Sequence, residues 1–227
     1  MLQAKKMLWV LTMAACLVWS ASASADFVAN PGFEDQPLAE GVPSYTIPSW
    51  NSDYAPDFTY VINPDPVNWP YAVAHSGDNV MVMGCTSAQS NYVYQNALAM
   101  SAGTTYSLSA YVSQLDGLDP GYVFLSLFNV RTGSHVASAT SDPTYSATWP
   151  IEYVGVPSTS WTQLMTPAYT ATGEDEGAML RVDIWVWQRT GGDYNYAAWD
   201  DFSISAVPEP TTIGLLAVGG LLLRRRK

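Results

Sequence analysis

Two tryptophans, Trp185 and Trp187, lie two residues apart in a segment that alternates apolar and polar side chains. In a β-strand this spacing places both indoles on one face, about 7 Å apart, together with Asp183. Flat aromatic faces stack on the C–H groups of a sugar ring, while nearby polar groups fix its hydroxyls. We therefore predict a concave sugar platform of Trp185, Trp187 and Asp183, with Tyr111 on the corresponding face of its own strand. The alternative is that loops cover this face and the rings fill a core.

Residues arranged for catalysis are sparse. The two histidines, His75 and His135, have no evident Ser or Cys partner, and no G-x-S-x-G motif occurs. Asp200 and Asp201 are adjacent, so a strand places them on opposite faces and they cannot flank one bond as two glycosidase carboxylates do. With these two histidines and one cysteine, Cys85, in the predicted mature chain, the sequence has no Cys/His zinc-binding pattern. We expect no enzymatic activity.

The elements that would position these residues are short β-strands. β-Branched and aromatic residues, punctuated by Gly, Pro, Asp and Asn, concentrate at 58–62, 79–83, 104–113, 121–130, 161–170, 178–188 and 198–205. Two of these segments alternate strictly, and their apolar faces are Tyr106, Leu108, Ala110 and Val112, and Leu180, Val182, Ile184 and Val186. This pattern predicts an all-β domain, an antiparallel two-sheet β-sandwich or jelly roll.

The distribution of charge restricts the partners of this domain. Residues 26–207 hold nineteen of the twenty acidic residues but only three of the nine basic ones, namely Arg131, Arg181 and Arg189. Such a surface repels phosphate backbones, which argues against nucleic acid as a partner. It suits neutral ligands and divalent cations.

The N-terminus has the pattern of an export signal. Lys5 and Lys6 precede an apolar run at 7–19, and Ala23-Ser24-Ala25 fits a cleavage site. We predict a signal peptide at 1–25, a mature chain that starts at Asp26, a β-sandwich domain at 26–205, and a linker with a C-terminal tail at 206–227.

The C-terminal tail combines three features in order. Pro208-Glu209-Pro210 precedes an apolar run of eleven residues, Ile213 to Leu223, and four basic residues end the chain. As a helix the run would reach about 16 Å, short of the roughly 30 Å core of a bilayer. The tail resembles the PEP-CTERM sorting signal of Gram-negative bacteria. That resemblance implies an exosortase as partner, transient membrane association through the tail, and delivery to the cell envelope or an extracellular exopolysaccharide matrix.

A series of short motifs in the domain gives a second resemblance. The series is Val28-Ala-Asn-Pro-Gly-Phe-Glu34, His75-Ser-Gly-Asp-Asn-Val80, Val93-Tyr-Gln95, Ala102-Gly-Thr-Thr-Tyr-Ser-Leu-Ser109 and Trp199-Asp-Asp-Phe-Ser-Ile204. It resembles the galactose-binding-like jelly rolls of carbohydrate-binding modules. Within them it is similar to the bacterial group that includes the calcium-dependent Stig cyclases.

The same resemblance implies a structural Ca²⁺ between the first and last strands. Glu34 and Asp200 match its carboxylate positions, and the carbonyl of Gly32 would add a further ligand. Independently, Asp200 shares strand phase with Phe202 and Ile204, and an inward carboxylate needs a partner or a metal. The alternative is that Glu34 and Asp200 are ordinary acids at strand ends.

Together these features predict an exported, surface-sorted β-sandwich that binds extracellular polysaccharide without catalysis. Two alternatives stay open. One is a structural matrix protein without a discrete ligand, and the other is a calcium-dependent, cyclase-like enzyme acting on a small molecule.

Overall fold

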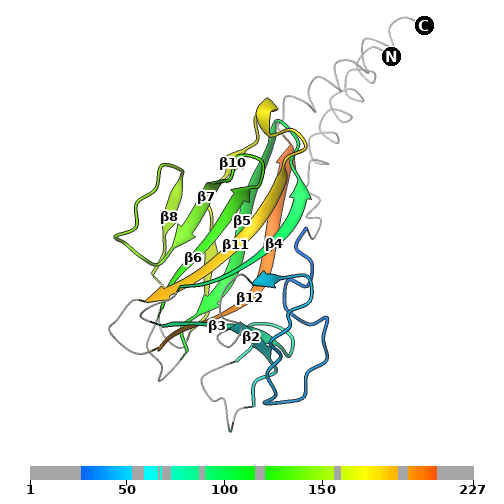
Figure 1. The fold of residues 1–227 in the computed structure, drawn as a ribbon, viewed down its shortest axis with the longest axis vertical. Helices are drawn as coiled ribbons and strands as arrows, with labels where there is room; N and C mark the ends of the chain where they lie inside the picture. Colours follow the sequence, from blue (N-terminus) through cyan, green and yellow to red (C-terminus); the bar gives the residue numbers. More distant parts are fainter. Residues whose placement is uncertain are drawn as a thin grey trace, which may run out of the picture.

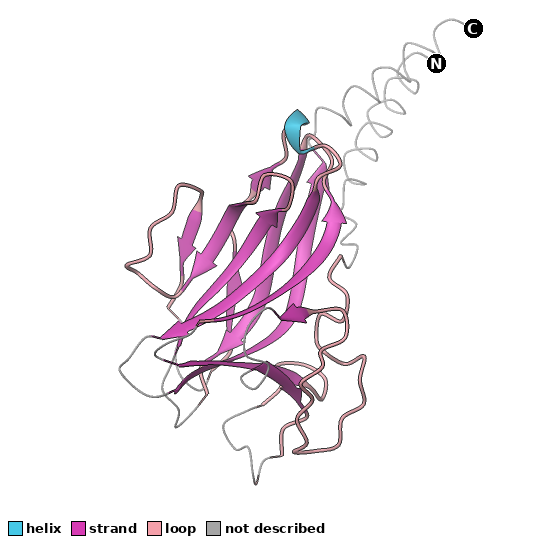
Figure 2. Ribbon diagram, in the orientation of Figure 1, coloured by secondary structure: helices cyan, strands magenta, loops and turns pink. Residues whose placement is uncertain are grey.

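A computed structural model describes residues 27–52, 59–65, 67, 73–86, 90–115, 121–155, 160–188 and 194–208. The predicted signal peptide, Asp26, Glu209 and Pro210 lie outside the described residues. Strands dominate the described chain, which also contains one short 3₁₀ turn, Gly173–Asp175 (Figure 2). None of the helical segments in this part of the chain is long and apolar enough to cross a bilayer.

The strands form two antiparallel-rich sheets, which confirms the predicted two-sheet β-sandwich (Figure 1). In spatial order the first, here called the β11 sheet, contains β1 (Asn51–Ser52), β4 (Asn91–Ala99), β11 (Met179–Gln188), β6 (Gly121–Asn129), β7 (Ser134–Thr140) and β8 (Ile151–Tyr153). The second, here called the β12 sheet, contains β10 (Tyr169–Thr170), β5 (Thr104–Ser113), β12 (Tyr194–Pro208), β3 (Val80–Thr86) and β2 (Thr59–Ile62), with β9 (Thr162–Met165) also paired to β5. Neighbouring strands are antiparallel, except for the parallel pair β7 and β8.

The core lies between the two sheets because one face of each long strand is apolar. The predicted inward faces of β5 and β11 are buried throughout, with exposed fractions of 2% or less. They pack in one hydrophobic cluster with side chains from both sheets. Alternation of period two therefore fixes which face of β11 remains for a site.

The predicted strand at 161–170 is two strands, β9 and β10. The interruption falls at Thr166 and Pro167, where proline has no N–H for the ladder. Thr166 keeps this segment hydrogen-bonded to β5 at the interruption. Its N–H donates to the carbonyl of Leu108, and its hydroxyl accepts from the N–H of Leu108, at 2.9 and 3.0 Å.

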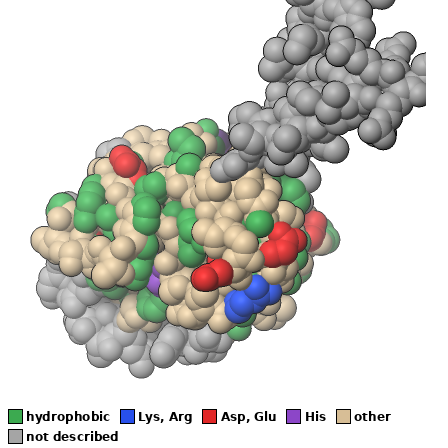
Figure 3. Space-filling view, turned by 90° about the horizontal axis from the view of Figure 1, so that it is seen from above, with side chains coloured by type: hydrophobic (Ala, Val, Ile, Leu, Met, Phe, Trp, Pro, Cys, Tyr) green, Lys and Arg blue, Asp and Glu red, His purple; other side chains and the backbone are tan. Residues whose placement is uncertain are grey.

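Strand β12 passes the predicted domain boundary at 205. Ala206 lies opposite Tyr106 of β5, and Pro208 lies opposite Thr104. Pro208, the first proline of the Pro-Glu-Pro tripeptide, is thus the last described residue of the ladder. Figure 3 looks from above onto one end of the sandwich, where apolar and neutral polar side chains separate a few acidic groups and a basic group.

Candidate functional site

The outer face of the β11 sheet carries a row of aromatic side chains. The register places Trp185 between Tyr92 of β4 and Phe124 of β6. The ring centroids of Trp185 and Tyr92 are 4.5 Å apart, and those of Trp187 and Phe124 are 6.1 Å apart. Trp185 and Trp187 therefore share one outward face, as their spacing predicted, but they stand in a cluster rather than on an open surface.

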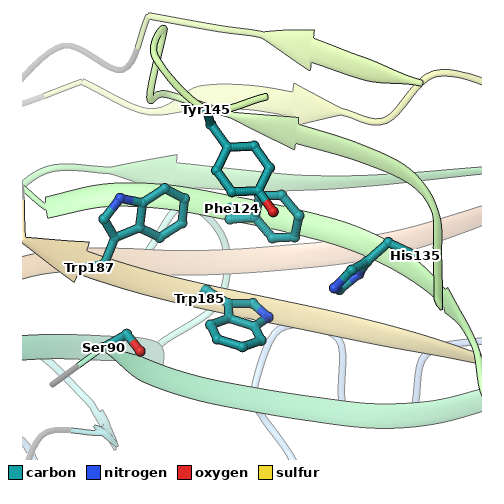
Figure 4. Close-up of a pocket in the computed structure, with 6 residues that line it drawn as sticks. All are labelled: Ser90, Phe124, His135, Tyr145, Trp185 and Trp187. Atoms are coloured by element: carbon teal, nitrogen blue, oxygen red, sulfur yellow. The ribbon is translucent and has the colours of Figure 1, made fainter. Parts of the chain in front are cut away.

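These rings line a pocket with a volume of about 360 Å³. Its lining residues, drawn in Figure 4, are Ser90, Phe124, His135, Tyr145, Trp185 and Trp187. The ring of Tyr145 lies over one side, with its centroid 5.3 Å from that of Phe124 and 5.9 Å from that of Trp187. The tryptophans thus form walls of a partly enclosed pocket, not a flat platform.

Local hydrogen bonds hold Tyr145 in place between β7 and β8. Asp142 Oδ1 accepts from the N–H and the hydroxyl of Thr144, at 2.8 and 2.6 Å, a turn that Asp favours. The carbonyl of Asp142 accepts from the N–H of Tyr145, and the carbonyl of Tyr145 accepts from the hydroxyl of Tyr153. Burial raises the pKa of Tyr145, so its phenol is neutral.

Asp183, predicted to contact the ligand, lies beneath the rings and is fully buried. Arg181 binds it at two points, with Nε to Oδ1 at 2.6 Å and a terminal nitrogen to Oδ2 at 3.0 Å. Burial alone would lower the pKa of Arg181, but the hydrogen bonds and charge of Asp183 raise it. The guanidinium also lies 4.1 Å from the ring centroid of Phe128. Asp183 is therefore neutralised and is not among the pocket-lining residues.

Tyr111, the fourth predicted ligand residue, lies apart from this pocket. Its strand, β5, belongs to the β12 sheet, whereas the tryptophans are on β11. Its ring stacks on His75, with centroids 3.6 Å apart and planes at 17°. Sequence alternation assigns a face within one strand but not the sheet to which that strand belongs.

His135 is a pocket residue that the sequence did not reveal. It lies on β7, beside Phe128 in the register, and its ring centroid is 5.4 Å from that of Phe124. Burial, with a smaller contribution from the charge of Arg181, lowers the pKa of His135 to about 4. The pocket therefore combines aromatic walls with a neutral imidazole, a set that suits an uncharged ring ligand.

A second group of polar residues surrounds Asp200 on β12. Asp200 is fully buried, as its strand phase predicted, and its Oδ2 accepts from the N–H groups of His75 and Ser76, at 2.8 and 3.1 Å. Asp201 is partly exposed and its Oδ2 lies 2.6 Å from Nδ1 of His75. Burial raises the pKa of Asp200 to about 7, with a smaller contribution from the charge of Asp201, while backbone hydrogen bonds from Ser76, Asp201 and His75 oppose the rise.

Glu34 is bound to the same region by the Ser-Gly-Asp-Asn turn. Its Oε1 accepts from the N–H groups of Asp78 and Asn79, at 2.9 and 2.8 Å. A Cβ at Gly77, where φ is +61°, would lie 2.4 Å from this oxygen, so the turn requires glycine. Gly32 lies between the acids, since a Cβ built there would be 3.4 Å from Asp200 Oδ1.

The donor set around Gly32 fits a hard cation such as Ca²⁺, which prefers carboxylate and carbonyl oxygens. Asp200 is a buried carboxylate whose pKa is raised, and a cation would compensate it. Among the described residues, however, no group of three or more His, Cys, Asp or Glu side chains is placed to hold a metal ion. Backbone carbonyls would therefore have to supply most of the ligands.

Comparison with protein families identifies a PEP-CTERM protein-sorting motif at residues 206–227. The motif confirms the resemblance found in the tail and indicates an exported protein that an exosortase sorts. Its first residues, 206–208, are also the last described residues of β12. No curated protein matches the chain.

Comparison with solved structures confirms the jelly-roll fold. A Stig cyclase from Fischerella sp. TAU, in complex with an indole compound, has a TM-score of 0.60 at 16% identity and covers 80% of this chain and 96% of its own. A carbohydrate-binding module in complex with β-1,4-galactotriose has a TM-score of 0.51 at 15% identity, covering 80% and 98%. A xylan-binding domain from Paenibacillus barcinonensis has a TM-score of 0.51 at 14% identity, covering 83% and 98%.

Proposed function

We propose that this exported domain binds neutral carbohydrate in the pocket between Trp185, Trp187 and Tyr145, and that it associates non-catalytically with polysaccharide outside the cell. The observation that carries the proposal is the pocket itself, a space of about 360 Å³ with aromatic walls and a neutral imidazole. Ligand pockets typically measure about 300–1,000 Å³ and combine apolar walls with a few polar groups. A space at the lower limit suits one or two sugar rings.

The electrostatics of the domain agree with a neutral ligand. Arg181 and Asp183, the charged pair on the same face of β11 as the two tryptophans, neutralise each other. Two fold neighbours bind a galactotriose and a xylan, and this is why those sugars are the first ligands to test.

The second candidate is a cyclase-like enzyme acting on an aromatic small molecule. The partial enclosure of the pocket favours it, as does the fold likeness to a cyclase that holds an indole compound. The position of Asp183 weighs against it, because the described lining residues include no carboxylate that could transfer a proton.

Affinity electrophoresis and calorimetry of the mature protein against β-1,4-galactan, xylan and the producing strain's own polysaccharide test the proposal. Retention by at least one polysaccharide, with quenching of tryptophan fluorescence, is the expected result. Tight binding of indole compounds without retention by any polysaccharide would favour the cyclase-like alternative instead.

We also propose that Ca²⁺ stabilises the fold at Glu34 and Asp200, with the carbonyl of Gly32 as a further ligand. The ion would neutralise the buried carboxylate of Asp200 and join the loop at 30–34 to the middle of β12, where the ladder with β5 shifts register between Asp200 and Ser203. Two non-glycine residues in this loop, Asn30 and Phe33, have positive φ values of 50° and 62°. Such conformations are uncommon and concentrate where the surrounding structure imposes them.

A further inference from the structure

A chain of hydrogen bonds through two buried serines leads to His135. Nε1 of Trp149 donates to Oγ of Ser138 at 2.8 Å, and Oγ of Ser138 donates to Oγ of Ser126 at 3.1 Å. Oγ of Ser126 lies 2.7 Å from Nδ1 of His135. Both serines are fully buried, so water does not compete for these groups. The chain therefore determines which nitrogen of His135 carries the proton.

A count of protons and lone pairs assigns the tautomer. A serine hydroxyl has one proton and two lone pairs. At Ser126 one lone pair accepts from the hydroxyl of Ser138. The hydroxyl oxygen of Ser126 also lies 3.1 Å from the carbonyl oxygens of Leu127 and Ala137, either of which can accept its proton. With the serine proton donated to one of these carbonyls, the remaining lone pair faces Nδ1 of His135, and Nδ1 is then the donor.

The charge next to the imidazole favours the same assignment. Oδ2 of Asp183 lies 3.9 Å from Nδ1 of His135. A carboxylate attracts an N–H group and repels a nitrogen lone pair. With the proton on Nδ1, a neutral imidazole presents Nε2 as a hydrogen-bond acceptor.

The acceptor Nε2 of His135 and the donor Nε1 of Trp185 belong to residues that line the same pocket. Among the described residues Nε2 of His135 has no hydrogen-bond partner, and the imidazole lines the pocket. Nε1 of Trp185 is buried and also has no partner in this part of the chain. Figure 4 shows the indole nitrogen of Trp185 on the side of the ring that faces His135. The pocket thus offers one unpaired acceptor and one unpaired donor between aromatic walls.

We propose that the pocket selects ring ligands that give a hydrogen-bond donor to Nε2 of His135 and an adjacent acceptor to Nε1 of Trp185. Two neighbouring hydroxyls of a sugar supply this pair, since each hydroxyl both donates and accepts. The ligand class rests on the proposed function, whereas the tautomer does not depend on any ligand. A ligand with a bare hydrocarbon edge leaves both groups desolvated and unpaired, and should bind at least about fivefold more weakly.

Imidazole nitrogen spectroscopy tests the tautomer directly. Two-bond ¹H–¹⁵N correlation spectra of the labelled mature protein at pH 7 contain signals from two histidines, and His135→Gln identifies one of them. We expect a protonated Nδ1 and a bare Nε2. A proton on Nε2 would overturn the proposal, and the wild-type spectrum alone decides this.

Variants of the serines test the cause of the tautomer. Ser126→Ala removes the acceptor for Nδ1 and should transfer proton population to Nε2. Ser113→Ala removes a buried serine of the β12 sheet and should leave the spectrum of His135 unchanged. If Ser126→Ala folds and the proton remains entirely on Nδ1, the hydrogen-bond chain does not set the tautomer.

Titration with β-1,4-galactotriose, with xylotriose and with oligosaccharides from the producing strain's polysaccharide tests the ligand class. The expected result is binding that shifts Nε2 of His135 and the indole N–H of Trp185. Binding that leaves both signals in place would overturn this inference while the carbohydrate function stands. If none of these sugars binds, the carbohydrate function and the ligand class both fail, whatever the tautomer.

Discussion

The guanidinium of Arg181 holds the carboxylate of Asp183 at two points from the same face of β11, at 2.6 and 3.0 Å. The two residues are separated by one position, and the pair lies under the aromatic rings rather than in the pocket. Asp183, which the sequence suggested as a ligand-binding residue, is therefore a buried structural residue beneath the pocket.

Removing one partner of this pair should destabilise the fold strongly. Arg181→Met leaves the carboxylate of Asp183 buried without its cation, and a broken buried pair commonly costs about 3–5 kcal/mol. Chemical denaturation of Arg181→Met measures the loss, and the double variant Arg181→Met/Asp183→Leu should recover much of it. A double variant no more stable than Arg181→Met would show that the ion pair is not what the single change disrupts.

The stability of the fold should fall in mild acid because of His135. Its pKa is about 4 in the folded protein, below the ordinary histidine value of about 6.5, so the unfolded chain binds more protons between these two pH values. The stabilisation is complete above about pH 6.5 and decreases as the pH falls towards 4. The loss is roughly 2–3 kcal/mol once the value of about 1.4 kcal/mol per pKa unit is reduced for the partial exposure of the ring to solvent. Urea unfolding at several pH values measures the slope. His135→Gln should flatten it, and an unchanged slope would exclude His135 as its source.

Chelation should lower the melting temperature if Ca²⁺ occupies the site at Glu34 and Asp200. A ligand that binds the folded state alone stabilises it by about 2.7 kcal/mol at a hundredfold excess over its Kd. Asp200→Asn should abolish the sensitivity to EDTA, whereas Glu152→Gln, at an exposed acid on β8, should retain it. A wild-type transition that EDTA leaves in place would refute the calcium assignment.

Folding should not require the residues after Pro208, but it should depend on residues 206–208, which pair with β5. Deleting Glu209–Lys227 leaves every described strand intact and should change the location of the protein but not its melting temperature. Deleting Ala206–Lys227 also removes the last ladder pairs between β12 and β5 and should cost about 1 kcal/mol or more. Equal melting temperatures for the two truncations would place the domain boundary at 205 after all.

Period-two alternation predicted the inward faces of β5 and β11, whereas β4, which also packs in the core, was not predicted. The predicted bounds of β5 match those observed, and the buried set of β11 is the predicted one, because burial on one face imposes alternation on a sequence. Strand β7 was missed because its sequence, Ser134–Thr140, is rich in Ser and Ala, which carry a weak strand signal. Its place in the sheet comes from antiparallel pairing with β6 across the turn at 130–133, where Gly133 has a φ of 67°.

The candidate site was predictable only where its residues share one strand. The spacing of Trp185 and Trp187 predicted their common face, but Tyr145 comes from a loop and His135 from the missed strand. Tyr111 was grouped with the tryptophans because alternation gives no information on which sheet a strand joins. The pairing of Asp183 with Arg181 was not foreseen either, although the two residues lie on one predicted face.

Substitution of the pocket tryptophans tests the central claim most directly, when glycan affinity and melting temperature are measured on the same variants. Truncating an aromatic anchor commonly costs 2 kcal/mol or more of binding, so Trp185→Ala and Trp187→Ala should each weaken retention at least about tenfold. Trp161→Ala, at a partly buried tryptophan near His75, should leave binding unchanged. The account predicts lost affinity with a preserved fold for both pocket variants. A large fall in melting temperature without a specific loss of binding would instead show that the rings are core filler and contradict the account.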